Sequence, residues 1–137
     1  MAAGLFMDII EILLVDSDPA HSRGIEDPLV RSGHQLDRIT HDAAVAHISR
    51  EDMSRYTAVI VVLADEPSTL SDTYKLGEYV LHYLAQLCPE VLPRVIVVTP
   101  DAQLAKTVSP LSRVLLEPVA EEALLAAVSA AMVESAK

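Results

Sequence analysis

Acidic and hydroxyl side chains close three apolar runs of this sequence, and they are the residues best suited to chemistry. Asp16 and Asp18 follow the first run, and Asp65 follows a later one. Thr99 closes a third. Clustered carboxylates bind hard cations such as Mg²⁺. In open parallel sheets, ligands bind where the carboxyl ends of the strands meet, so this spacing points to one edge of a sheet.

The apolar runs are typical of strands buried on both faces. Residues 58–64 are all apolar, and most of them are β-branched. A helix is the competing interpretation, but β-branched side chains lose rotamer freedom on a helix and pack well on a pleated surface. The second strand lacks clean alternation, so it should be partly exposed and edge-like. Strands are predicted at residues 9–15, 34–40, 58–64, 95–98 and 113–116.

Helices are predicted between these strands. Gly33 is a natural stop for the first helix, and Pro28 should kink or shorten it. Asp42 is the candidate cap of the second helix. On the third helix, the apolar side chains that recur at helical spacing, Leu87 included, are expected to pack into the core. The predicted helices cover residues 19–32, 42–48, 72–88, 101–108 and 120–135.

Alternation of strands and helices predicts an α/β fold. We expect a doubly wound, five-stranded parallel sheet with helices on both faces and the flavodoxin-like order 2-1-3-4-5. The length of 137 residues fits one domain, over residues 8–137, behind a flexible N-terminal tail of residues 1–7.

The formal net charge of −10 excludes several function classes. Phosphate contacts need Lys and Arg, so binding to nucleic acid or to an anionic membrane is not expected. Cys88 is the only cysteine, which favours a reducing, cytoplasmic location, and its apolar context predicts that it is buried. The five histidines show no metal-ligand spacing with Cys88. No catalytic set is visible, so we do not expect an enzyme.

The order and spacing of these segments resemble the receiver domain of bacterial response regulators over about residues 8–134. The resemblance is carried by residues 12–19 (ILLVDSDP), 97–100 (VVTP) and 115–119 (LLEPV), together with the buried third strand. It implies phosphorylation of an aspartate at the end of the third strand. It also implies Mg²⁺ at an acidic pair after the first strand, a hydroxyl after the fourth, and a lysine before a proline after the fifth.

Several of these positions carry the wrong side chain. The acidic pair becomes Asp16 and Ser17, so one carboxylate is lost. The acceptor position falls on Val62, whose isopropyl group cannot accept a phosphoryl group. Thr99 fits the hydroxyl position, but Glu117 replaces the lysine and reverses its charge. The loss of three functional groups predicts a degenerate pseudo-receiver, which works as a protein-interaction module without phosphorylation or cofactor.

Two other hypotheses stay open. In the first, the chain is an atypical receiver of a two-component phosphorelay: Asp65 is the phosphoryl acceptor, and Mg²⁺ is held by Asp16, Asp18 and Asp65. In the second, the chain binds a small molecule, although no glycine-rich phosphate loop follows the first strand. Pro118 matches the family's proline, and a cis Glu117–Pro118 bond is expected.

The last helix is rich in alanine, which bears on the choice of partner. Small side chains allow close helix approach, as in a homodimer. Alternatively, alanine only favours the helix. The sequence identifies no protein partner.

Overall fold

The fold is described by a computed structural model that places residues 10–16, 19–50, 55–62, 80–99, 113–116 and 119–136. The predicted tail at residues 1–7 and the predicted helix at 101–108 lie outside these ranges. Residues 80–87 are helical and form part of the helix predicted at 72–88. The remaining elements are β1 (Glu11–Val15), α2 (Pro19–Arg31), β2 (Gln35–Ile39), α3 (His41–Arg50), β3 (Ala58–Val62), the 3-10 helix η2 (Pro89–Arg94), β4 (Val95–Thr99), β5 (Arg113–Leu116) and α6 (Glu121–Ala136).

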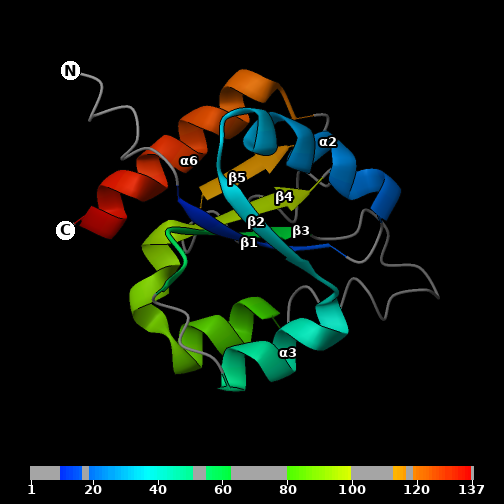
Figure 1. Cartoon of the computed structure of the whole chain (residues 1–137). Helices are drawn as coiled ribbons and strands as arrows, with labels where there is room; N and C mark the ends of the chain where they lie inside the picture. The colour runs from blue at the N-terminus through cyan, green and yellow to red at the C-terminus, as the bar shows by residue number, and fades with distance from the viewer. Residues whose placement is uncertain are drawn as a thin grey trace.

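The strands form one parallel sheet in the order β2-β1-β3-β4-β5, which confirms the predicted topology. Helices α2 and α6 cover one face, and α3 lies on the other with the helical residues 80–87 (Figure 1). The second strand is an edge strand, as its irregular polarity predicted. The three strands in the middle of the sheet therefore end side by side at the same edge.

Two apolar layers hold the helices to the sheet, because successive strand residues point to opposite faces. The buried side chains on the α3 face are Leu13, Val15, Ala44, Ile48, Tyr56, Val59, Val61, Val80, Leu84, Cys88, Val91, Val95 and Val97. Those on the α2 and α6 face are Ile10, Ile12, Leu14, Ile25, Leu29, Ala58, Ile60, Val62, Ile96, Val98, Leu124, Ala127, Val128 and Ala131. The prediction that Cys88 is buried is confirmed.

Helix α2 ends at Arg31, and Gly33 stops it two residues later, as predicted. The amide of Gly33 donates to the carbonyl of Val30 at 2.9 Å, and that of His34 donates to Leu29 at 3.2 Å. This is a Schellman motif, and it requires the left-handed φ of 90° that Gly33 adopts. Pro28 does not shorten the helix, contrary to one expectation. It removes only the bond to the carbonyl of Gly24, which lies on an exposed part of the helix.

The cap of α3 differs from the prediction. The amide of Ala43 donates to Thr40 Oγ1 at 3.2 Å, so Thr40 is the N-cap in place of Asp42. The helix begins at His41, one residue before the predicted start, which puts Asp42 inside the first turn. A threonine hydroxyl can satisfy a free amide there as a carboxylate would.

The chain after residue 87 also differs from expectation. Leu87 is 52% exposed, whereas it was expected in the core. Val80, Leu84 and Cys88 follow one another at intervals of four and take the buried positions, which turns Leu87 outward. The short helix η2 follows directly and begins at Pro89.

Helix α6 packs Leu124 and Val128 into the core, with Leu125 and Met132 partly buried beside them. At its start, Glu121 forms an ion pair with Arg31 of α2, which joins the two helices on this face. Among the placed residues, no helix has the length and apolar character needed to cross a membrane.

Candidate functional site

Three of the predicted site residues lie together at the carboxyl edge of the sheet. Val15 pairs with Val61, so Asp16 follows β1 beside Val62, the last residue of β3. Val62 pairs with Val98, and Thr99 is the last residue of β4. All three are buried. The ends of three adjacent strands thus bring a carboxylate, an isopropyl group and a hydroxyl to one edge.

Val62 belongs to the apolar layer under α2 and α6. Its side chain is 6% exposed and packs in the same cluster as Ile60 and Val98. By strand alternation, Asp16 points to the same face as Val62, while Thr99 points to the α3 face. Among the described residues of this edge, the middle position is therefore apolar, with a carboxylate on one side. Valine offers neither a nucleophile nor a metal ligand.

A basic residue that the sequence analysis missed lies beside Asp16. Arg38 of β2 donates from Nη1 to the backbone carbonyl of Asp16 at 3.4 Å, and its Nε lies 4.0 Å from Glu26 Oε2. Glu26 also accepts a 2.6 Å hydrogen bond from Ser22 on α2. These contacts connect α2 and β2 to the end of β1. The sequence could have indicated this position of Arg38, because the predicted strand order makes β1 and β2 neighbours.

The other predicted site residues lie outside the described ranges. They are Ser17, Asp18, Asp65, Glu117 and Pro118. The expected cis bond before Pro118 and the alternative Mg²⁺ site at Asp16, Asp18 and Asp65 thus stay predictions. Among the residues that are placed, no group of three His, Cys, Asp or Glu could hold a metal ion.

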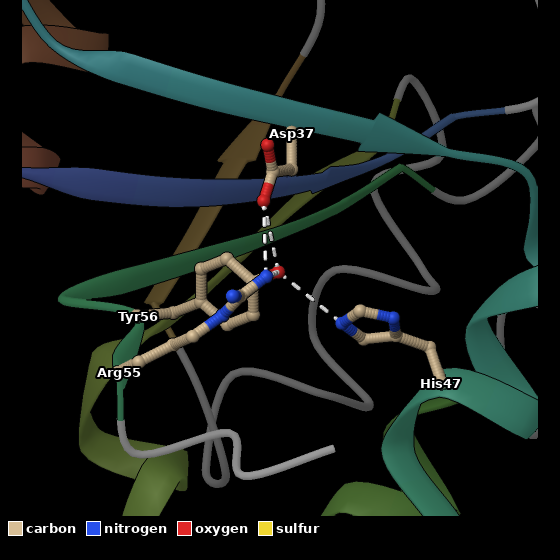
Figure 2. A network of polar contacts seen from close by, with 4 residues as sticks. All are labelled: Asp37, His47, Arg55 and Tyr56. Carbon is tan, nitrogen blue, oxygen red and sulfur yellow. Dashed lines mark hydrogen bonds and ion pairs between the residues drawn. The ribbon is translucent and has the colours of Figure 1, made fainter. Parts of the chain in front are cut away.

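A second polar cluster, also missed, lies near the amino edge of the sheet and centres on the phenol of Tyr56 (Figure 2). The phenol donates to Asp37 Oδ2 at 3.1 Å and accepts a hydrogen bond from Arg55. His47 Nε2 of α3 lies 3.2 Å from the same oxygen. The guanidinium of Arg55 lies 4.6 Å from the centre of the Tyr56 ring and also pairs with Asp37 at 3.2 Å.

The hydrogen-bond capacity of the Tyr56 phenol limits which groups of this cluster donate to it and which accept from it. A phenol has one hydrogen and two acceptor sites. With its hydrogen given to Asp37, the phenol oxygen accepts from Arg55 and can accept a second hydrogen bond from the Nε2–H tautomer of His47. Burial raises the pKa of the Tyr56 phenol, and the hydrogen bond from Arg55 opposes this only in part. The phenol therefore stays protonated at neutral pH.

Comparison with known proteins adds to this geometry. No known family model and no curated protein matches the sequence. Solved structures do match. A response regulator receiver protein from Sinorhizobium medicae aligns with a TM-score of 0.67 at 15% identity, over 94% of this chain and 98% of that one. This chain has the receiver fold.

Two more receiver-fold matches have similar scores. A sensor protein from a Polaromonas species aligns at 19% identity and a TM-score of 0.68, over 92% of this chain and 98% of that one. The receiver domain of a sensor histidine kinase from Pseudomonas aeruginosa, which has a magnesium ion in its active-site cleft, aligns at 19% identity and a TM-score of 0.69, over 91% and 98%. At such identities the likeness establishes the fold and leaves the chemistry to the residues.

Proposed function

We propose that this chain is a pseudo-receiver, a receiver fold that works in bacterial signalling or regulation as a protein-interaction module without being phosphorylated. The supporting observation is Val62. It ends β3 beside the buried Asp16 and fills the centre of the carboxyl edge with an apolar side chain. A carboxylate acceptor there would need a cation to offset the charge of the transferred group. Arg38 lies beside Asp16 and contacts its backbone carbonyl.

The proposed role is binding in the cytoplasm, with no catalysed reaction. The partner is a protein, and a second copy of this chain is one arrangement that α6 allows. On the outward side of α6, Ala123, Ala126 and Val133 are exposed, and no charged residue lies between Ala123 and Val133. Sedimentation of the chain over a range of concentrations tests the dimer, and Ala126→Glu should prevent it.

Incubation with a small phosphodonor and Mg²⁺, read by intact mass, tests the absence of phosphorylation. We expect no added phosphoryl group on the wild-type chain. The Pseudomonas aeruginosa receiver domain is a suitable comparison for the Mg²⁺ conditions, since its cleft holds that ion. A stable, acid-labile adduct on the present chain would refute the proposal.

The variant Asp65→Asn separates the two signalling hypotheses. If the chain is an atypical receiver of a phosphorelay with Asp65 as the acceptor, labelling appears in the wild type and disappears in this variant. If labelling appears and survives the substitution, Asp65 is not the acceptor either.

A further inference from the structure

One hydroxyl group connects three separate segments of this fold. The Tyr56 hydroxyl donates a hydrogen bond to Asp37 on β2, and its oxygen lies 3.2 Å from His47 Nε2 on α3. The Tyr56 ring is buried just before β3. Arg94 fixes that anchor, because its Nη1 donates to the backbone carbonyl of Tyr56 at 2.8 Å from a buried position. Figure 2 shows the phenol between the strand and the helix. The phenol is thus attached to the centre of the sheet, and β2 and α3 are in turn held to the phenol.

The segments on the far side of these bonds bury few apolar side chains of their own. Among the described strands, β2 pairs with β1 alone, its side chains are exposed or half-buried, and Arg38 adds contacts to Asp16 and Glu26. Among the α3 side chains that are described, Ala44 and Ile48 are buried. The two elements are consecutive in the chain and are joined at Thr40. Elements with few buried apolar contacts open at a lower free energy than the core does.

We propose that the Tyr56 phenol is a latch, and that its release lets β2 and α3 open together while the rest of the sheet stays folded. This device goes beyond the proposed function, since the moving part responds to contacts near the amino edge, away from Val62. The side chains of Asp37 and Arg55 are already about half exposed, so water replaces their partners readily when the latch opens. The closed state then depends on the phenol, which is the buried member of the cluster.

Native-state hydrogen exchange of the full chain tests the latch. In Tyr56→Phe, the amides of β2 and α3 should exchange about fivefold faster, equivalent to about 1 kcal/mol for one lost hydrogen-bonding group. In both proteins, the amides of β4 and α6 should keep a higher opening free energy than those of β2 and α3, because they exchange only when the whole fold opens. Tyr83→Phe is the matched control, because Tyr83 is half-buried and its phenol makes no hydrogen bond to a described residue.

Two milder variants test whether the segments open as one unit. Asp37→Ala changes only an exposed side chain of β2, yet it should also speed exchange in α3. His47→Phe keeps a ring and a similar helix propensity on α3, and it should also speed exchange in β2. Acceleration confined to the substituted element, a single opening free energy shared by β2, α3, β4 and α6, or no acceleration in any of these variants would overturn the proposal.

Discussion

Asp37 and Arg38 are neighbours on β2, and their side chains act on opposite faces of the sheet. Asp37 accepts the hydrogen bond of the Tyr56 phenol on the α3 face. Arg38 lies 4.0 Å from Glu26 of α2 on the other face. Two adjacent charges therefore tie the edge strand to both layers. Charged side chains also protect such an edge from pairing with another chain.

The two glycines of the α2 region should respond to alanine in opposite directions. Gly24 lies in the helix, and a Cβ added there meets nothing within 4 Å. Gly24→Ala should raise the free energy of unfolding by about 0.5–1 kcal/mol, because alanine loses less backbone entropy. Gly33→Ala should lower it by about 1–2 kcal/mol, because Gly33 has a left-handed φ of 90°. Urea unfolding measures both, and equal signs would contradict the assignment.

Removing the Thr40 cap should weaken α3. Thr40→Ala leaves the amide of Ala43 without its 3.2 Å bond and should cost about 1 kcal/mol of unfolding free energy. Thr40→Ser keeps the hydroxyl and is the control, with a loss of only a few tenths of that amount. Equal losses in the two variants would show that the methyl group, and not the cap, stabilises this corner.

The contrast between Thr40 and Asp42 illustrates what the sequence could and could not predict. Continuous β-branched runs identified the central strands, because few other structures bury every residue of such a run. The predicted N-cap of α3 was wrong because either Thr40 or Asp42 could cap the helix, and the choice depends on where the first turn starts.

The Tyr56 cluster could not be predicted for a different reason. Its members come from β2, α3 and the segment before β3, and only the register of the strands and the packing of α3 bring them together. Arg38 was missed in the same way, although the strand order was correct. The local sequence pattern thus predicts helices and strands, whereas polar sites built from several of them depend on side-chain geometry.

Alkaline pH should test the environment of the Tyr56 phenol. Burial raises its pKa in the folded state. Its contribution to stability is therefore complete below the pKa of an unfolded tyrosine, about 10, and is lost as pH rises through the higher folded value. Of the four tyrosines, at least one should ionise late in an absorbance titration. Tyr56→Phe should remove that step, and persistence of the late step would assign it to another tyrosine.

Val62→Asp tests whether the carboxyl edge still accommodates an acceptor. The new carboxylate would be buried in the apolar layer beside Asp16. Burial and the like charge both favour the protonated form, so the folded-state pKa of the new group should rise. The variant should lose about 3 kcal/mol or more at neutral pH, and this loss should shrink as the pH falls from the raised folded-state pKa to the pKa of an unfolded aspartate. Val62→Asn is the uncharged control, and its loss should vary little with pH. If Val62→Asp were tolerated at neutral pH, the edge would have kept a cation site able to hold a carboxylate, and the pseudo-receiver proposal would lose its main support.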